Sequence, residues 1–297
     1  MKALIKPLPP GSRLAVVAPA GPAKPGVLAQ VAPVVAHLGF QVQLMPGCQG
    51  PAYLDHLAAP DAQRLADLHT ALADPAVDAL LCLRGGYGCI RLLDRLDLDL
   101  VQRAAKPLIG YSDITSLHAV WAQLGIPAWH APMPASDWVK PGGLPDAERL
   151  ARALQQGVLE GDVQSADRAH GLSQGGTAQG RLLGGNLSVL ASCLGTRFMP
   201  DLRGAILFLE DVSEDPYRVD RYLAHLKLAG ALDGVAGFLL GSFTDSALSS
   251  DAVLADHLSP LGRPILAGWP AGHGQPNHAL PLGLRVTMDV ATRSLHW

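Results

Sequence analysis

A serine stands where a predicted strand meets a predicted helix. Residues 110–115 read GYSDIT and follow the apolar run KPLI. Gly110 permits a tight turn, and the free N–H groups of the helix start would stabilise the oxyanion formed when Ser112 attacks a carbonyl. The stretch is similar to the nucleophile elbow G-x-S-x-G, although Ile114 replaces the second glycine. Taken alone, the stretch favours the simpler interpretation that Ser112 caps the helix.

A nucleophilic serine needs a general base, and the chain offers eleven histidines. His273 is distinctive because it lies between Gly272 and Gly274, directly after the predicted strand PILAGWP. Flanking glycines permit unusual backbone angles, and loops that follow strands often carry chemistry. His278 is a rival in the same loop, and a solvated loop histidine is the structural alternative. Helical patterns predict surface or packed side chains for His37, His69, His118, His225 and His257.

The base in turn needs an orienting acid, for which Glu210 is the best-placed candidate. Five apolar residues precede it in AILFLED, so its carboxylate would lie where a buried strand emerges. Burial of that charge is costly unless a partner such as an imidazolium compensates for it. Asp211 is the alternative, and on a strand it would face the opposite way. The structural alternative for this acidic segment is a helix start, and Asp215 followed by Pro216 has that pattern. A helix start explains Asp215 but not Glu210.

Two glycine pairs could supply backbone donors. LRGGYG (83–88) follows a predicted strand, and its N–H groups could complete an oxyanion hole or hold a phosphate. The dinucleotide pattern G-x-G-x-x-G is incomplete there, because Arg91 takes the place of the last glycine. RLLGGNLSVL (181–190) leads into a predicted helix with Asn186 as its cap, and a tight turn is the alternative for its glycines.

Composition narrows the function classes. Among 297 residues, 48% are hydrophobic and 16% charged, which is typical of a globular protein, and the net charge of −3 gives no footprint for nucleic acid or an anionic membrane. No apolar run is long enough for a membrane span or a signal peptide, so we expect a cytoplasmic protein. We expect no metal or other cofactor, because H-E-x-x-H and close ligand clusters are missing. The four cysteines (Cys48, Cys82, Cys89, Cys193) have no C-x-x-C spacing and are predicted to be reduced core residues.

The elements that must position these residues belong to an α/β fold. Apolar strands alternate with helical patterns through the first half, which predicts a parallel sheet covered on both faces. A polar, glycine-rich tract interrupts the middle, and strand patterns then resume, ending in an antiparallel strand within 284–297. We therefore predict an N-terminal α/β domain (1–140), a linker region (141–175) and a smaller β-rich C-terminal domain (176–297), with a site between the domains.

Five motifs, GYSDIT, LRGGYG, LLGGN, LFLEDVSEDPYRVDRYL and GHGQPNHALPLG, resemble in type and order the LD-carboxypeptidase family. The resemblance covers essentially the whole chain. It implies a flavodoxin-like N-terminal domain and a metal-free triad with Ser112 as nucleophile, Glu210 as orienting acid and His273 as base. It further implies an oxyanion hole formed by the backbone N–H groups of Asp113 and Gly86, and frequent homodimers.

Bacterial members of this family remove the terminal D-alanine from cytoplasmic murein tetrapeptide during cell-wall recycling, so we expect a serine carboxypeptidase that cleaves an L,D-peptide bond. Two alternatives remain: a related serine peptidase that acts on peptidyl-nucleotide antibiotics and gives self-immunity, and a non-catalytic protein that binds a ligand between its domains. For the substrate carboxylate, Arg84, Gly85, Arg218 and the backbone near Asn186 are candidates, and each of these has a structural alternative.

Overall fold

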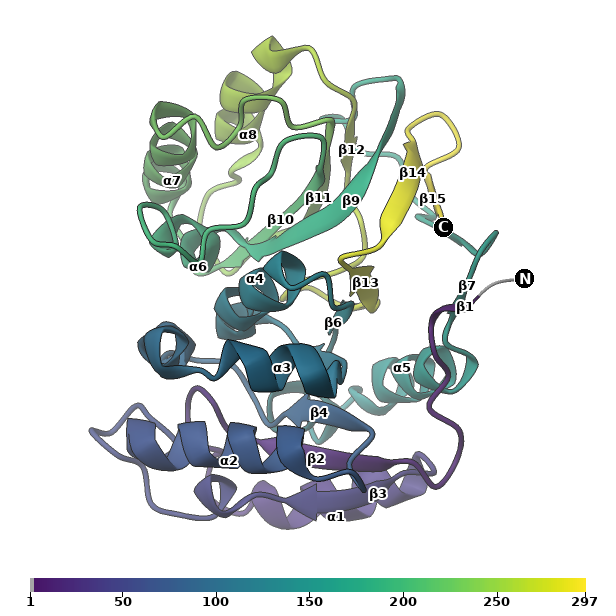
Figure 1. The fold of residues 1–297 in the computed structure, drawn as a ribbon. Coiled ribbons are helices and arrows are strands. Elements are labelled where there is room, and N and C mark those ends of the chain that lie inside the picture. Colours follow the sequence, from purple (N-terminus) through teal and green to yellow (C-terminus); the bar gives the residue numbers. More distant parts are fainter. Residues whose placement is uncertain (1–2) are drawn as a thin grey trace.

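The computed structural model describes residues 3–297, which form two large sheets that meet near the middle of the molecule (Figure 1). The strands of the N-terminal sheet are parallel in the order β3-β2-β4-β5-β6, and β13 adds an antiparallel edge. This is the flavodoxin-like strand order, so the predicted fold class is confirmed. The bounds are β2 (Arg13–Val17), β3 (Gln41–Leu44), β4 (Ala79–Cys82), β5 (Leu108–Gly110), β6 (Ala128–His130) and β13 (Leu280–Leu282).

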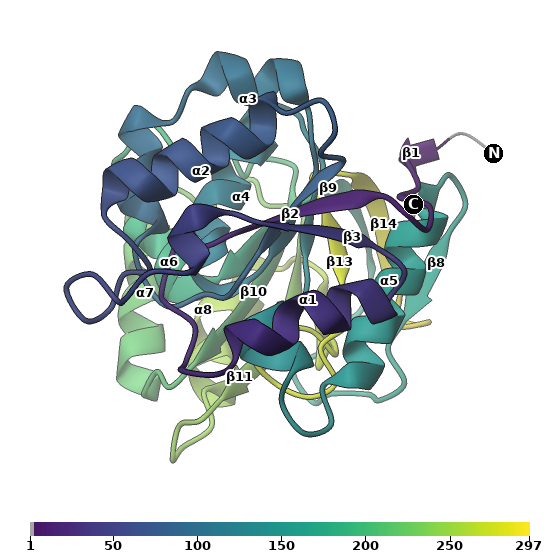
Figure 2. The same cartoon turned by 90° about the horizontal axis from the view of Figure 1, so that it is seen from below.

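Helices cover both faces of this sheet, as continuous apolar strands require. Within β2, Leu14 and Val16 face one core and Ala15 and Val17 the other, following the period of two in a strand. Figure 2 shows the helices of the first face, α1 and α5, opposite those of the second. The helix bounds are α1 (Leu28–His37), α2 (Asp61–Ala73), α3 (Leu98–Ala104), α4 (Thr115–Gln123) and α5 (Leu144–Gln156).

The second sheet combines four parallel strands with an antiparallel extension, in the order β12-β11-β10-β9-β14-β15-β8. Helices α6 (Leu187–Ser192), α7 (Pro216–Leu228) and α8 (Asp251–Leu258) pack on one face of the sheet. The predicted C-terminal strand is a hairpin of two antiparallel strands, β14 and β15. The strand bounds are β8 (Val163–Ser165), β9 (Thr177–Asn186), β10 (Ile206–Val212), β11 (Gly237–Thr244), β12 (Ile265–Ala267), β14 (Arg285–Asp289) and β15 (Ser294–His296).

The glycine pair before Asn186 lies in a strand, so the tight-turn interpretation is wrong. Gly184 and Gly185 directly precede Asn186, the last residue of β9, which is the central strand of the second sheet. A Cβ on Gly184 would overlap the carbonyl of Phe208, and one on Gly185 would overlap Thr115 of α4. Both positions therefore require glycine because other segments of the same chain, β10 and α4, approach β9 closely. This requirement comes from the tertiary structure and not from a turn.

The region 141–175, predicted as a linker, is ordered and contributes to both halves of the molecule. Helix α5 packs into a core of the N-terminal sheet through Leu150 and Leu154, whereas β8 joins the C-terminal sheet. Between them, β7 (Val158–Leu159) pairs with β1 (Ala3–Ile5). Within residues 3–297, no helix combines the length and apolar character needed to cross a membrane.

Candidate active site

Ser112 follows β5 at the edge of the N-terminal sheet where the parallel strands end. It opens a short 3₁₀ turn, η3 (Ser112–Ile114), which continues into α4. Its φ of +65° lies in the left-handed region, which is costly for a residue with a side chain and typical of strained functional turns. Neither η3 nor α4 has a side-chain cap. The interpretation of Ser112 as a helix cap is therefore wrong.

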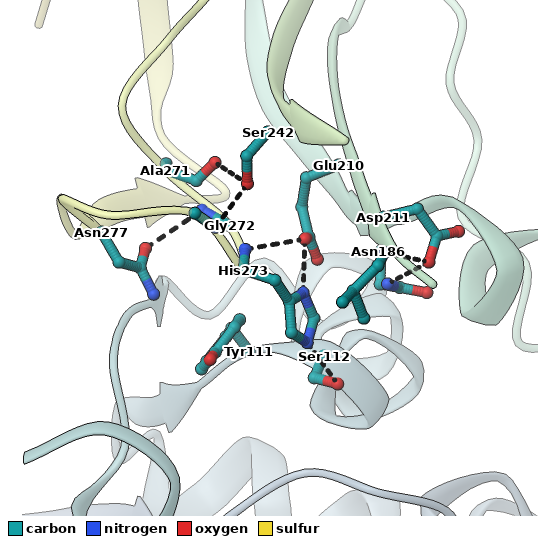
Figure 3. A network of polar contacts seen from close by, with 12 residues as sticks. Tyr111, Ser112, Asn186, Glu210, Asp211, Ser242, Ala271, Gly272, His273 and Asn277 are labelled. Atoms are coloured by element: carbon teal, nitrogen blue, oxygen red, sulfur yellow. Dashed lines mark hydrogen bonds and ion pairs between the residues drawn. The ribbon is translucent and has the colours of Figure 1, made fainter. Parts of the chain in front are cut away.

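The Ser112 hydroxyl lies against an imidazole from the loop that joins β12 to β13. His273 Nε2 is 3.2 Å from Ser112 Oγ, and His273 Nδ1 is 2.7 Å from Glu210 Oε2. The backbone N–H of His273 donates to the same Glu210 oxygen at 3.2 Å. Figure 3 shows the imidazole between the carboxylate and the hydroxyl. The three residues predicted to form a triad are thus connected by hydrogen bonds.

Glu210 lies near the end of β10 and is fully buried. Two glycines let the histidine loop approach it closely, because a Cβ on Gly272 would lie 2.8 Å from Glu210 Oε2 and one on Gly241 3.2 Å from Glu210 Cβ. Asp211, the alternative acid, points elsewhere, as strand alternation predicts. Its carboxylate accepts hydrogen bonds at 2.8 Å from Asn186 Nδ2 and from the N–H of Ser188.

The loop that carries His273 is held on both sides of the histidine. Gly272 N donates to Asn277 Oδ1 at 3.0 Å, and Gly274 N donates to Ser242 Oγ at 2.8 Å. Asn277 N in turn donates to Asp146 Oδ2 of α5 at 3.1 Å, which connects the loop to the N-terminal half. These contacts fix the position of the imidazole before any substrate binds.

His278, the rival base, lies apart from this arrangement. Its side chain lines a cavity of about 570 Å³ together with Arg149 and His170, and neither Ser112 nor His273 lines that cavity. Burial lowers the pKa of His278. The structure therefore brings His273, and not His278, to the serine.

Opposing effects act on the pKa of His273. Burial lowers it, but the charge of Glu210 and the hydrogen bond to Nδ1 raise it by more, and Asp211 and Asp137 add to the increase. The pKa therefore lies above the ordinary value of 6.5. An imidazole of this kind is a strong proton acceptor in its neutral form.

The second glycine pair, 85–86, lies beside the serine. A Cβ on Gly85 would lie 2.7 Å from Ser112 Cβ and 2.9 Å from Ser112 Oγ. The Asp113 carboxylate accepts a 2.8 Å hydrogen bond from Cys89 N, which ties this loop to the serine turn. Within residues 3–297 neither the N–H of Gly86 nor that of Asp113 donates to a protein group. Both remain candidates for binding an oxyanion.

Comparison with known proteins decides the family. Residues 14–131 match the model of the LD-carboxypeptidase N-terminal domain, and residues 179–288 match that of the LD-carboxypeptidase C-terminal domain. Together these matches span most of the chain. The chain belongs to the LD-carboxypeptidase family. It is therefore a peptidase, as the resemblance of its motifs implied.

Individual LD-carboxypeptidases are similar over nearly their whole length. The chain is 37% identical to a probable murein peptide carboxypeptidase of Bacillus subtilis, over 97% of this chain and 92% of the relative. It is 35% identical to the murein tetrapeptide carboxypeptidase of Pseudomonas aeruginosa, over 95% and 94%. The crystal structure of muramoyltetrapeptide carboxypeptidase from Oxalobacter formigenes superposes with a TM-score of 0.85 at 28% identity, covering 96% of this chain and 97% of that one.

The candidate substrate-binding residues of this LD-carboxypeptidase also have structural contacts. Arg84 Nη1 donates to the carbonyl of Pro22 at 2.9 Å. The Asn186 side chain caps α6 by accepting from Val189 N, and its Nδ2, which carries two hydrogens, donates only to Asp211 within residues 3–297. Arg218 is paired with Glu214 at 3.6 Å. Binding of the substrate carboxylate by Arg84, Gly85 or Asn186 stays a prediction.

Two residues at the site were missed by sequence reasoning. The Tyr111 ring lies 4.7 Å from the imidazole of His273 between centroids, and its hydroxyl donates to Asp137 Oδ1 at 3.0 Å. Tyr111 directly precedes the serine, so its place at the site could have been inferred from the motif. Asp137 lies 26 residues farther along the chain in a stretch with no catalytic pattern. Only the fold brings it to the site.

We predict that Gly85→Ala impairs this LD-carboxypeptidase. The added methyl group would displace Ser112, and a shift of about 1 Å in a reacting group lowers the rate by roughly 10²-fold. Steady-state kinetics on a murein tetrapeptide would measure this loss. Gly50→Ala is the matched control and should retain full activity, because no atom of residues 3–297 lies within 4 Å of a Cβ added at Gly50. Equal activity of the two variants would contradict the proposed position of the serine.

Proposed function

We propose that this chain is a serine LD-carboxypeptidase that releases the terminal D-alanine from murein tetrapeptide by cleaving an L,D-peptide bond. The observation that carries the proposal is the connected series Glu210–His273–Ser112, with a buried carboxylate at one end and a half-buried hydroxyl at the other. The names of relatives that are similar over their full length support the substrate class.

In the first half of the proposed reaction, His273 Nε2 accepts the Ser112 proton as Ser112 Oγ attacks the carbonyl carbon of the L,D-peptide bond. Glu210 accepts the Nδ1–H of the imidazolium and keeps Nε2 directed at the serine. The N–H groups of Asp113 and Gly86 stabilise the carbonyl oxygen as it gains negative charge. His273 then protonates the departing nitrogen, the C–N bond breaks, and D-alanine leaves.

In the second half, water hydrolyses the acyl-enzyme. His273 Nε2 takes a proton from the water, and the resulting hydroxide attacks the ester carbon. The same two backbone N–H groups receive the second oxyanion. The C–O bond to Ser112 breaks, His273 returns the proton to Ser112 Oγ, and the shortened peptide is released.

The deciding experiment is mass spectrometry of a murein tetrapeptide digested by the purified protein. The proposal requires loss of one D-alanine and no further cleavage. A panel that includes peptidyl-adenylate mimics separates this function from self-immunity against peptidyl-nucleotide antibiotics, because the triad chemistry would serve either substrate. Turnover of the mimics without turnover of tetrapeptide would overturn the murein assignment.

A non-catalytic binding protein would hydrolyse neither substrate. Binding of tetrapeptide would raise its melting temperature, and the increase would be the same in the Ser112→Ala variant. This alternative gives no role to the hydrogen bonds that connect Glu210 and Ser112 through His273.

We also propose that the enzyme acts in the cytoplasm as a homodimer, in keeping with the family that its motifs resemble. Cell fractionation followed by immunoblotting tests the location, with recovery in the membrane or exported fraction as the contrary result. Light scattering on the purified protein tests the dimer, and a mass corresponding to 31.1 kDa would identify a monomer.

The pH dependence of the reaction follows from the raised pKa of His273. Because the base must be neutral to accept a proton, we expect kcat/KM to rise with pH around a midpoint above 6.5. The charged pair with Glu210 stabilises the fold fully below 6.5 and loses that contribution as the pH rises through the raised pKa of the folded state. A pH–rate profile measures the midpoint, and a value at or below 6.5 would contradict this view of the base.

A further inference from the structure

Tyr111 contacts the imidazole on a side that the triad does not use. Tyr111 is 4% exposed, and its ring lies 4.7 Å from the ring of His273 at an interplanar angle of 52°. Figure 3 shows Tyr111 beside the imidazole, while Glu210 and Ser112 occupy its two nitrogens. An aromatic ring in this position limits rotation of the imidazole away from the plane that serves both hydrogen bonds.

Tyr111 is in turn held by a carboxylate. Its hydroxyl donates to Asp137 Oδ1 at 3.0 Å, and Asp137 Oδ2 accepts from Met133 N at 2.8 Å and from Ser136 Oγ at 2.9 Å. Asp137 belongs to a π-helical turn, Pro134–Trp138, a rare conformation that occurs frequently at functional sites. Burial and the charge of Asp137 raise the pKa of Tyr111, so the phenol remains a hydrogen-bond donor.

We propose that Tyr111 and Asp137 are positioning residues for His273. The Tyr111 ring fixes the plane of the imidazole. The Asp137 carboxylate anchors Tyr111 and adds a further negative charge, beside those of Glu210 and Asp211, near the imidazolium that forms during the reaction. This inference rests on the proposed function, because it assigns a role in the same acyl transfer. It adds an aromatic ring and, beyond Glu210 and Asp211, a further carboxylate to the environment of the base.

Other titratable groups also face His273. Glu210 and Asp211 of β10 favour the imidazolium through their charges, and Glu210 is bonded to the ring directly. His130 of β6 is fully buried, and burial lowers its pKa well below the ordinary value, so it carries no charge near the site. Asp137 is therefore an acidic group on the N-terminal half that favours the imidazolium, in addition to the two on β10.

Three variants separate these roles. Tyr111→Phe keeps the ring and removes the hydrogen bond to Asp137, so we expect a fall in kcat of about three- to tenfold with little change in KM. Tyr111→Leu also removes the ring, and the misplaced imidazole should lower kcat by roughly 10²-fold. Asp137→Asn removes the negative charge, so the pKa of His273 should fall. The midpoint of the acid limb of the kcat/KM profile should then shift to lower pH by about half a unit.

The experiment has readouts that do not need the peptide substrate. Labelling of Ser112 by a fluorophosphonate probe reports on the base, and NMR titration of the His273 ring reports on its pKa directly. Asp67→Asn is the matched control. Asp67, in α2, is a buried carboxylate that accepts a hydrogen bond from Gly47 N at 2.7 Å, and its replacement should not change the titration midpoint of His273. If the wild-type protein is labelled at Ser112 but cleaves no tetrapeptide, the proposed substrate is refuted. The labelling rates of the variants then still test the positioning role of Tyr111 and Asp137.

The inference is supported if Tyr111→Phe and Tyr111→Leu slow both labelling and turnover in that order, and if Asp137→Asn lowers the His273 titration midpoint. It is overturned if Tyr111→Phe and Asp137→Asn change only the melting temperature while labelling rate, kcat and titration midpoint match the wild type. Tyr111→Phe and Asp137→Asn are nearly isosteric and decide the question even if Tyr111→Leu does not fold.

Discussion

Replacing Ser112 with alanine is expected to abolish release of D-alanine from murein tetrapeptide, with a loss in kcat of about 10⁴-fold or more by analogy with other serine triads. The hydroxyl is the only group at this position that can form the acyl-enzyme, and His273 Nε2 lies 3.2 Å from it. The substitution removes one oxygen from a half-buried side chain, so the fold should persist. Quantifying D-alanine under single-turnover conditions gives the rate.

Ser192→Ala serves as the control for this experiment. Ser192 is exposed on α6, and its hydroxyl donates to the carbonyl of Val189 within the same helix. Its loss should leave the rate within about twofold of the wild type, as expected for a surface substitution. A Ser112→Ala variant that released D-alanine as fast as Ser192→Ala would remove the serine from the mechanism.

The second large effect concerns the buried acid. Glu210→Gln preserves shape but replaces an acceptor by an amide that can donate to His273 Nδ1. That donation would place the remaining ring hydrogen on Nε2, where it blocks acceptance of the Ser112 proton. By analogy with a triad whose aspartate is replaced by asparagine, kcat should fall by about 10³- to 10⁴-fold. The amide nitrogen would then stand where Glu210 Oε2 now accepts the backbone N–H of His273, so that N–H would lose its acceptor.

Asp211→Asn is the matched control for Glu210→Gln, because the two carboxylates are adjacent on β10 and face opposite ways. Burial raises the pKa of Asp211 to about 6. Its bonds to Asn186 and Ser188 hold the ends of β9 and β10 together, so the substitution should lower stability by about 1–3 kcal/mol. Kinetics and thermal unfolding of both variants check the contrast. A larger loss of kcat in Asp211→Asn than in Glu210→Gln would make Asp211 the acid.

Much of the N-terminal half could be predicted locally. The alternation of apolar strands with helical patterns predicted β2 to β5 and the helices α1, α2 and α4, whereas the three-residue strand β6 was missed. Gly125, which has a positive φ, follows the end of α4. Between β4 and α3 the chain forms a 3₁₀ helix, Cys89–Arg95. Helices α3 and α8 were missed because their short stretches carry weak periodicity.

Local signals also placed the start of α7 and the cap of α6. Asp215 precedes Pro216 at the first position of α7, and Asn186 caps α6, as the sequence pattern predicts. The same signals misjudged β9, because its glycines resemble turn residues when read alone. What makes Gly184 and Gly185 suitable for a strand is the close approach of Phe208 and Thr115, residues that no local pattern connects to them.

By itself, therefore, the sequence determined the parallel α/β architecture, the position of Ser112 after a strand and, through its family motifs, the identities of the three candidate catalytic residues. Only the tertiary structure decided that Ser112 does not cap its helix, that His273 and not His278 reaches it, and that Tyr111 and Asp137 border the imidazole. The physical reason is the separation along the sequence over which each kind of interaction acts. Periodicity and turn chemistry act over a few residues, whereas the hydrogen bonds of His273 join positions 63 and 161 residues apart and depend on how two sheets pack.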